Sequence, residues 1–380
     1  MSAIVDVGLT RFQKKREENV VALAAAAYKP LLRHAEKIDF VIVANSYSGE
    51  LNLVSGINNH FTSHVSLDKV RSLRADNISG SGGTAIFMAD TLIKAKVAQT
   101  VLVIGVEKMS DKNTAENAEI ISTLLTERER ESGVTLPSLA ALMAKSYMQE
   151  YNADREAIAW VAVKSHKNGS LNQYAHYQKE TSIQQVMNSA IVADPLRAFE
   201  YSPISDGAAA LLITSNENAI KFTPKPVFIK AIGFAADTSH LTFRDDFTSI
   251  EAVREAGKMA YSMANVKPKD IGFAELHDMA TILEIVQSED LQLFDRGQGW
   301  HCARDGTTAI DGQMPINTSG GLISKGHPIG ASGVAQATEA FFQIRGEAGA
   351  RQVKSNKLGL SISLAGFGNN ATVIVYGDSE

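Results

Sequence analysis

An internal repeat of one structural plan constrains the fold of this chain more than any other feature. In the first half, an Ala-rich helical stretch leads into the apolar run IDFVIVANS, then a Gly/Ser turn, ISGSGG, a second helix and the strand VLVIG. In the second half, a helix within EAVREAGKMAYSMA leads into a strand that ends at His277 and Asp278, followed by GHPIGASG, a helix and the strand LGLSIS. Two βαβ-type units, each with a glycine-rich turn before a helix, predict a pseudo-twofold α/β fold.

Composition narrows the class of protein. The 380 residues, 44% of them hydrophobic and 21% charged, predict a large core divided into two or three lobes. A net charge of −5 and no basic cluster interleaved with aromatic residues argue against a nucleic-acid partner. The sequence shows no signal-peptide pattern, no apolar run of membrane-spanning length and no peroxisomal tripeptide, so we expect a cytoplasmic protein with no membrane partner.

Cysteine and histidine usage limits the chemistry. The single cysteine, Cys302, excludes an intrachain disulfide and a Cys-based zinc cluster. The nine histidines show no ligand-like pairing, so no metal site is predicted.

The chain divides into four expected segments. Residues 1–112 form the first part of an N-terminal half, 113–198 a polar insertion or loop domain, 199–235 the last strands of that half, and 236–380 the C-terminal half. Long insertions commonly cover or bind a ligand, and a plain surface excursion is the alternative.

The run NTSGGLISKGHPIGASG, residues 317–333, has the character of a reactive-centre loop. Its glycines, Gly326 among them, permit tight turns and a close approach of the backbone to a ligand. His327 stands between glycines just before an expected helix, and Pro328 fixes the backbone behind it. A positive helix end at His327 would favour negative charge that develops on a substrate oxygen.

Six short motifs are spread along nearly the whole chain: GVEKMSD, YSPISDGAAALL, the pair His277-Asp278, NTSGG, GHPIGASG and AGFGNNATVIVYG. Together they resemble the thiolase superfamily, most closely its sterol-carrier-protein-type and archaeal-type branches. The resemblance implies a five-layered αβαβα fold of two stacked halves with an inserted loop domain, a homodimer or dimer of dimers, and action on acyl-CoA thioesters. Coenzyme A would arrive as part of the substrate, with no permanently bound cofactor.

The resemblance also assigns roles to residues of this chain. His327 matches the GHP histidine, which in the family activates the nucleophile and helps hold the enolate oxygen. His277 matches the histidine of the family's HDCF loop, which has a similar role. The backbone N–H groups near Ser79 and Gly366 match the second oxyanion hole, which needs no particular side chain.

This chain departs from the family at each thiol. The nucleophilic cysteine that opens the first helix is replaced by Ser79, and the proton-shuttling cysteine has Met279 and Leu364 at its two family positions. Cys302 lies outside all the motifs and is interpreted as a small buried side chain. Met279 and Leu364 cannot exchange a proton, so ordinary thiolase chemistry is not expected.

The chain lacks the catalytic thiol but keeps the residues of the oxyanion hole that binds a thioester enolate. This combination favours retro-aldol cleavage of a 3-hydroxyacyl-CoA. A free cysteine with a pKa of about 8.5 is partly ionised at neutral pH, whereas a serine hydroxyl is not and needs strong base activation. Ser79 can alternatively act as the nucleophile of an acyltransferase, cap the helix, or donate a hydrogen bond to the ligand. The base for the 3-hydroxyl is left open among His327, Asp278 and Tyr201.

The remaining candidates have structural alternatives. Asp278 can orient a neighbouring group or cap a helix, Asn317 can fix the NTSGG turn or orient a catalytic water, and Tyr201 can simply pack in the core. In the loop KSHKNGSLNQYAHYQKE, three basic residues could meet the coenzyme A phosphates or merely be solvated. These three are His166, Lys167 and Lys179.

A different class of function stays open beside these enzymes. Loss of both cysteines also fits a non-catalytic acyl-CoA-binding subunit of a complex, although such a subunit would not need to keep His327 and His277. Some cysteine-free relatives resemble aldolases that work with a small acyl-CoA-associated OB-fold partner, so a partner of that kind is a further expectation.

Overall fold

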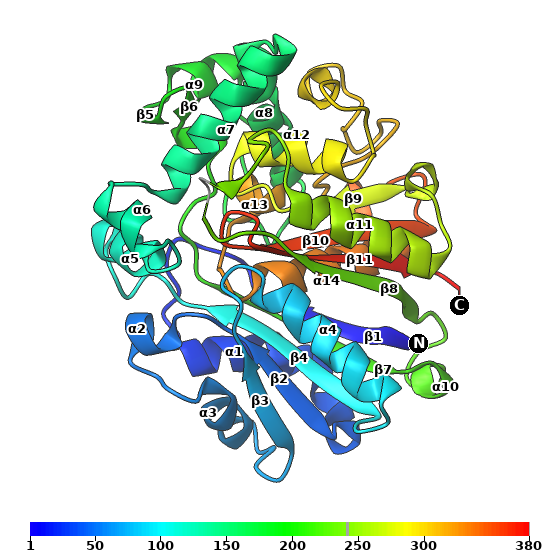
Figure 1. The fold of residues 1–380 in the computed structure, drawn as a ribbon. Helices are drawn as coiled ribbons and strands as arrows, with labels where there is room; N and C mark the ends of the chain where they lie inside the picture. Colours follow the sequence, from blue (N-terminus) through cyan, green and yellow to red (C-terminus); the bar gives the residue numbers. More distant parts are fainter. Residues whose placement is uncertain (241–242, 380) are drawn as a thin grey trace.

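The computed structural model describes residues 1–240 and 243–379, which form two stacked α/β halves (Figure 1). Their strands run in the order β3-β2-β4-β7-β1-β8-β11-β10-β9. The sheets of the two halves meet where β1 pairs antiparallel with β8 over three residues, Ser2 to Ile4. Both halves contain a parallel core, β3-β2-β4 in the first and β10-β9 in the second, as the repeated βαβ pattern predicts.

The first half builds its sheet from nearly continuous apolar strands, because helices cover both of its faces. Helices α1 and α3 pack on one face, and α4 packs on the other. The Asn19 side chain caps α1 by accepting hydrogen bonds from the backbone N–H groups of Val21 and Ala22. The elements are β1 (Ser2–Leu9), α1 (Val20–Tyr28), β2 (Phe40–Ala44), α2 (Ser48–Asn52), α3 (Ile57–His64), β3 (Arg71–Ala75), α4 (Ser81–Lys94), β4 (Thr100–Glu107), β7 (Gly207–Ser215) and α10 (Asn216–Ala219).

The segment between β4 and β7 is helical and lies over the second half (Figure 1). Its helices α7 and α8 pack against α12 and share a hydrophobic core with the C-terminal half. Reciprocal capping boxes start α5, α6, α7 and α9. The elements are α5 (Thr114–Ser122), α6 (Glu127–Glu131), α7 (Leu136–Tyr151), α8 (Arg155–Ser170), α9 (Ile183–Asn188), β5 (Ile191–Ala193) and β6 (Leu196–Arg197).

The second half repeats the plan and completes five layers. Helix α14 packs beside α4 between the two sheets, and α11 covers the outer face of β8 and β11. The layers are therefore α1/α3, first sheet, α4/α14, second sheet and α11/α12 (Figure 1). The elements are β8 (Val227–Ala236), α11 (Glu251–Ala264), β9 (Phe273–Glu275), α12 (Thr281–Asp290), α13 (Gly321–Lys325), α14 (Ser332–Arg345), β10 (Leu358–Ala365) and β11 (Asn370–Gly377).

One expected segment boundary differs from the structure, and one element of the repeat is shortened in the second half. Strand β8 was expected to close the first half at residue 235, yet it pairs along most of its length with β11 and belongs to the second sheet. The second-half equivalent of β3 is reduced to a single parallel bridge between Ala274 and Ile316, just before the NTSGG turn. The expected C-terminal segment also includes residues 241, 242 and 380, which lie outside the described residues.

The helices of the described ranges include none that is both long and apolar enough to cross a membrane.

Candidate active site

His327 lies in the turn between α13 and α14, and its ring is oriented by a neighbouring hydroxyl. Gly326 before it has a φ of 106°, which only glycine adopts readily. The Nδ1 atom of His327 lies 2.7 Å from Ser332 Oγ, and Ser332 donates its own proton to the Pro328 carbonyl at 2.9 Å. Because that hydroxyl proton is engaged, Nδ1 carries the hydrogen and donates it, and the lone pair of the neutral ring lies on Nε2.

His277 lies behind His327, just beyond the end of β9. The two rings meet edge to face, with centroids 5.0 Å apart and planes at 87°. His277 is 1% exposed, and neither of its ring nitrogens has a hydrogen-bond partner within the described part of the chain. The structure therefore brings the two predicted histidines together, and leaves the tautomer of His277 free to respond to a ligand.

Burial keeps both imidazoles neutral. It lowers the pKa of His327 to about 4. Burial, followed by the nearby His327, also lowers the pKa of His277 well below its usual range. At neutral pH the pair can accept or donate hydrogen bonds, but it carries no fixed positive charge.

Ser79 lies in a tight turn just before α4. Ile78 before it has a φ of 51°, a left-handed conformation that is strained for a β-branched residue. The N-cap of α4 is Gly80 and makes no side-chain capping bond, whereas Ser81 bonds to the Ile78 carbonyl at 2.6 Å. The Ser79 hydroxyl forms no hydrogen bond with a described residue, so the helix-cap alternative is not what the structure contains.

The turn at Ser79 lies against the end of β10, next to Gly366. Ser363 donates a hydrogen bond to the Ser79 carbonyl at 3.2 Å, and a Cβ added to Gly80 would lie 3.0 Å from Ala365 Cβ. Gly366 follows with a φ of 57°. The two backbone segments expected to form the second oxyanion hole are therefore neighbours, and their role stays a prediction.

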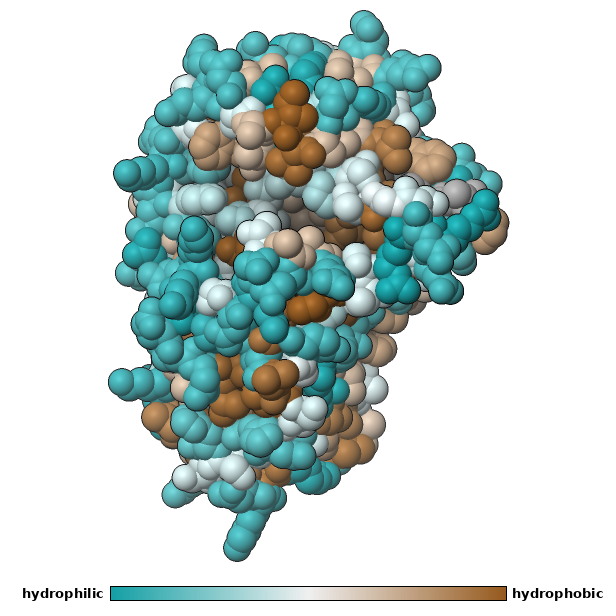
Figure 2. All heavy atoms as spheres, turned by 90° about the vertical axis from the view of Figure 1, so that its left-hand side faces the viewer, coloured by the Kyte–Doolittle hydropathy of each residue, from teal (hydrophilic) through white to brown (hydrophobic). Residues whose placement is uncertain are grey.

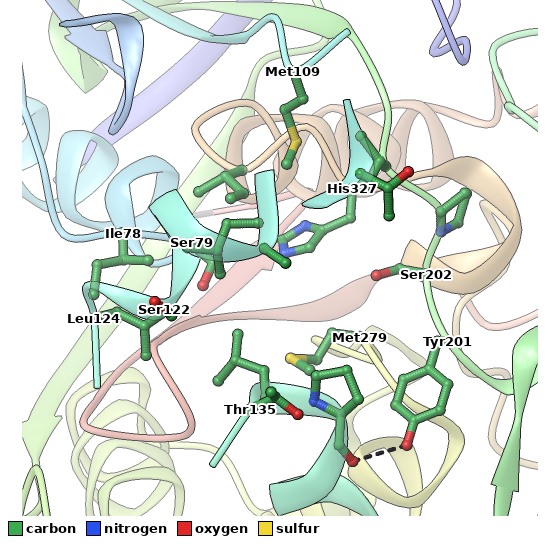
Figure 3. Close-up of a pocket in the computed structure, with 18 residues that line it drawn as sticks. Ile78, Ser79, Met109, Ser122, Leu124, Thr135, Tyr201, Ser202, Met279 and His327 are labelled. Carbon is green, nitrogen blue, oxygen red and sulfur yellow. Dashed lines mark hydrogen bonds between the residues drawn. The ribbon is translucent and has the colours of Figure 1, made fainter. Parts of the chain in front are cut away.

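An apolar pocket of about 270 Å³ is lined by His327 and Ser79, whereas His277 and Gly366 do not line it. His327 and Ser79 lie on one side, and Met279 and Tyr201 lie across from them (Figure 3). Residues 113–198 supply much of the wall through Leu124, Leu136, Pro137 and others, and no charged side chain of the described residues lines the pocket. Figure 2 shows the face that carries α5 and α6, where apolar residues gather around a hollow within a mostly hydrophilic surface.

Tyr201 lines the pocket as part of a closed wall. Its hydroxyl donates to the Pro137 carbonyl at 2.9 Å, and its backbone bridges to Ala280 beside the His277 loop (Figure 3). Burial, together with the charge of Glu200, raises the pKa of the phenol. The hydroxyl is therefore engaged with the backbone and poorly suited to act as a base.

Asp278 and Asn317 lie behind the pocket and have protein partners. Asp278 Oδ1 accepts from the Leu322 N–H at 2.6 Å at the start of α13, and burial followed by the charge of Glu284 raises its pKa well above the usual range. Asn317 Oδ1 accepts from the Leu276 N–H at 2.7 Å, and its Nδ2 donates to Glu284 at 2.7 Å. Both residues hold the backbone of the His277 loop and the NTSGG turn.

The three basic residues predicted to meet the coenzyme A phosphates do not line the pocket, and a phosphate contact of Lys167 or Lys179 stays a prediction. His166 is on α8 rather than on a loop, buried against Tyr177 and Phe199, and burial lowers its pKa to about 4. This corrects its expected position, because a neutral buried imidazole is a poor phosphate ligand. Lys167 and Lys179 are exposed and do not line the pocket.

Three residues that sequence reasoning did not single out shape the site. Ser332 orients His327, and Gln287 on α12 holds the backbone of His277. Glu107 ends β4 and accepts from Gly330 N–H at 3.0 Å as well as from three groups at residues 45–47. Ser332 and Glu107 lie inside the motifs GHPIGASG and GVEKMSD, which supply a signal in the sequence. Gln287 lies in none of the motifs named above.

The one thiol is remote from this pocket. Cys302 is buried, donates to the Gln298 carbonyl at 3.3 Å and lines a separate hollow that shares no residue with the pocket of His327. Burial raises the pKa of the Cys302 thiol to about 11. Among the described residues no cluster of three His, Cys, Asp or Glu side chains could hold a metal ion.

The five layers and the two histidine loops at one pocket define a two-lobed α/β protein of the αβαβα class. Residues 2–217 match the thiolase N-terminal domain and residues 233–378 the thiolase C-terminal domain-like family. The chain belongs to the thiolase family, which confirms the resemblance and the predicted fold.

Individual proteins agree with this assignment. The acetyl-CoA acetyltransferase of Methanothermobacter thermautotrophicus is 39% identical over 340 residues, 89% of this chain and 88% of the relative. Sterol carrier protein 2 of Bos taurus is 32% identical over 389 residues, 98% of this chain and 71% of the relative. The solved Ltp2-ChsH2(DUF35) aldolase superposes with a TM-score of 0.86 at 23% identity, over 99% of this chain and 97% of that one, a likeness of fold.

Proposed function

We propose that this protein is an acyl-CoA enzyme that cleaves 3-hydroxyacyl-CoA thioesters by a non-covalent retro-aldol reaction. One observation carries the proposal: a neutral His327 lines an apolar pocket beside Ser79, and no thiol lines that pocket. A site of this kind can move a proton and steady an enolate, but it lacks the thiolate that thioester exchange between two acyl groups needs.

The reaction balances without an acyl-enzyme. A base takes the proton of the 3-hydroxyl, the C2–C3 bond breaks, C3 becomes a carbonyl, and the electron pair moves into the thioester as an enolate. Protonation of the enolate at C2 then releases a shortened acyl-CoA. Hydrogen-bond donors near His277 and at the Ser79 and Gly366 backbones would stabilise the enolate oxygen.

His327 is the best of the three candidate bases. Its Nε2 lone pair is left open because Nδ1 donates to Ser332. Asp278 has a raised pKa and does not line the pocket, and the Tyr201 hydroxyl donates to a carbonyl. A proton acceptor must reach the substrate, which favours His327.

The pocket suits an apolar acyl group. Within the part of the chain that the structure describes, the pocket wall has no charged side chain, so a carboxylate or amine on the acyl chain would lose solvation without gaining a partner. Coenzyme A belongs to the substrate, and no permanently bound cofactor is proposed.

Acyl transfer through Ser79 is the second candidate. The Ser79 hydroxyl has no hydrogen-bond partner among described residues, lines the same pocket as His327 and precedes the N-terminus of α4. The name of the archaeal relative, acetyl-CoA acetyltransferase, supports this candidate. Against it, a serine hydroxyl is almost wholly protonated at pH 7 and forms an oxygen ester rather than a thioester.

Assembly is also part of the proposal. We expect a homodimer or dimer of dimers in the cytoplasm. The aldolase neighbour combines Ltp2 with ChsH2(DUF35), which supports a small acyl-CoA-associated partner for this chain. A non-catalytic acyl-CoA-binding subunit is the alternative for the whole molecule.

A product assay separates these candidates. The protein, alone and with candidate partner subunits, is incubated with matched 3-hydroxyacyl-CoA and 3-ketoacyl-CoA esters, and shortened CoA products are followed by mass spectrometry. The aldolase proposal requires cleavage of the 3-hydroxy esters that survives Ser79→Ala and is lost in His327→Ala. Acyl adducts on the intact protein that form from the 3-ketoacyl-CoA esters and vanish in Ser79→Ala would establish acyl transfer instead. No product and no adduct under any condition would favour a binding subunit.

A further inference from the structure

The ring of His277 is oriented through its main chain, by one buried amide. The Gln287 side chain accepts from the His277 N–H at 2.9 Å and donates to the His277 carbonyl at 2.9 Å. Because an N–H can only donate and a carbonyl can only accept, these two partners identify which side-chain atom of Gln287 is the oxygen and which is the nitrogen. We propose that Gln287 is a positioning residue that holds the His277 imidazole against His327 and the substrate enolate; the catalytic part of this inference rests on the proposed function.

The position of His277 explains why such a residue is needed. Strand β9 ends at Glu275, so His277 has no ladder partner on either side. Buried amides continue the hydrogen bonding beyond the strand: Asn317 binds the Leu276 N–H, and Gln287 binds both backbone groups of His277. Two bonds that flank one Cα hold the direction of its Cα–Cβ bond, and each χ1 rotamer then places the ring at one defined position.

Among the described residues, no side chain orients His277 by a hydrogen bond to the imidazole ring itself. Neither ring nitrogen has a hydrogen-bond partner among the described residues, whereas His327 is oriented directly by Ser332. The edge-to-face contact at 5.0 Å therefore depends on where the His277 backbone stands. Gln287 is 0% exposed on α12 and does not line the pocket, so it acts through His277 rather than on the substrate.

The chain provides a matched control in Gln336. This residue on α14 is also 0% exposed, and its Nε2 donates to the Leu276 carbonyl at 3.0 Å, one residue before His277. It makes no hydrogen bond to His277 itself. Gln336 thus binds the carbonyl end of the 276–277 peptide group, whose N–H end Gln287 binds. Gln336→Met removes that one bond and leaves both Gln287 bonds in place, whereas Gln287→Met removes the bonds on both sides of the His277 Cα.

The test measures kinetics, ring signals and stability together. We expect Gln287→Met to lower kcat about 10- to 100-fold with little change in KM, because ring displacements near 1 Å cost rates of that order. It should also shift or split the His277 ring cross-peak in carbon-13 NMR, assigned with His277→Gln. Gln336→Met should leave the kcat and the cross-peak close to wild type at a comparable thermal midpoint.

Gln287→Glu supplies an independent readout if the methionine variant does not fold. A protonated glutamic acid can still accept from the His277 N–H and donate to its carbonyl, but the ionised form loses the donor. Its kcat should therefore fall as pH rises through the pKa of the introduced acid, while the wild-type kcat does not.

Three outcomes overturn the positioning role: equal kcat losses in Gln287→Met and Gln336→Met, an unmoved His277 cross-peak, or a Gln287→Glu profile parallel to wild type. Wild-type protein that cleaves no 3-hydroxyacyl-CoA would overturn the proposed function instead, and the NMR comparison would still decide the role of Gln287.

Discussion

Replacing Ser332 by alanine tests the assignment of His327 as the base. In the wild-type structure the Ser332 hydroxyl accepts from His327 Nδ1 at 2.7 Å and donates to the Pro328 carbonyl at 2.9 Å. This arrangement keeps the proton on Nδ1 and the lone pair on Nε2. In Ser332→Ala the ring loses the acceptor, so the second tautomer and other ring orientations become accessible.

The size of the effect follows from one hydrogen bond. A neutral hydrogen bond contributes about 0.5–1.5 kcal/mol net, which corresponds to a roughly 2- to 13-fold change in population. We expect kcat for 3-hydroxyacyl-CoA cleavage to fall by that factor. KM should stay near the wild-type value, because Ser332 does not line the pocket.

The assay compares Ser332→Ala with Ser332→Thr, which keeps a hydroxyl. Steady-state kinetics gives kcat and KM, thermal unfolding checks the fold, and nitrogen-15 shifts of the His327 ring report its tautomer directly. If folded Ser332→Ala keeps both the wild-type kcat and the Nδ1–H tautomer, the reasoning that assigns Nε2 as the base is refuted.

Other expected outcomes concern pH, stability and the acyl group. Burial lowers the pKa of His327 from 6.5 to about 4, so the unfolded chain binds more protons than the folded protein between these two pH values. The contribution of neutral His327 to the free energy of unfolding is therefore complete above pH 6.5 and is lost as pH falls toward 4. A shift of this size corresponds to about 3 kcal/mol, and urea unfolding of His327→Gln should lack that part of the acid destabilisation. Glu107→Gln places an amide NH₂ among N–H donors that include Gly330, and should lower the free energy of unfolding by about 1.5–3 kcal/mol in the same assay. An unchanged free energy of unfolding would contradict the role of the Glu107 carboxylate in holding the backbone at Gly330. Tyr201→Ala opens the pocket wall that Tyr201 forms with Pro137. We expect kcat/KM to rise about fourfold for each additional methylene of the acyl chain that the enlarged pocket admits. A dependence of kcat/KM on acyl-chain length identical to wild type would argue against Tyr201 as part of the wall.

Local sequence patterns predicted the repeated halves and the reactive loop. Apolar runs, glycine turns and helical periodicity depend on neighbours within a few residues, so the strands around β2, β4, β9 and β10 and the helices after each turn were recognisable. The GHPIGASG motif located His327, and HDMAT located His277, because each follows a strand or turn of characteristic composition. The family and its αβαβα fold were predicted from those motifs and are confirmed by the family matches.

Residues 113–198 show where such reasoning stops. Their composition suggested a polar cover, but burial of His166 on α8 depends on contacts with Tyr177 and Phe199 that no local pattern encodes. The same holds for β8, whose placement in the second sheet results from pairing with β11, more than a hundred residues away.

The sequence by itself determined which residues could take part in chemistry: two histidines, a serine in place of the nucleophilic cysteine, and one thiol outside every motif. Only the tertiary structure decided how they are used. It places His277 edge to face with His327, turns the Nε2 lone pair of His327 away from Ser332, and surrounds the site with an apolar pocket that Cys302 does not reach. The physical reason is that residue type sets the chemistry a side chain can perform, whereas orientation, burial and the resulting pKa depend on partners brought together from distant parts of the chain.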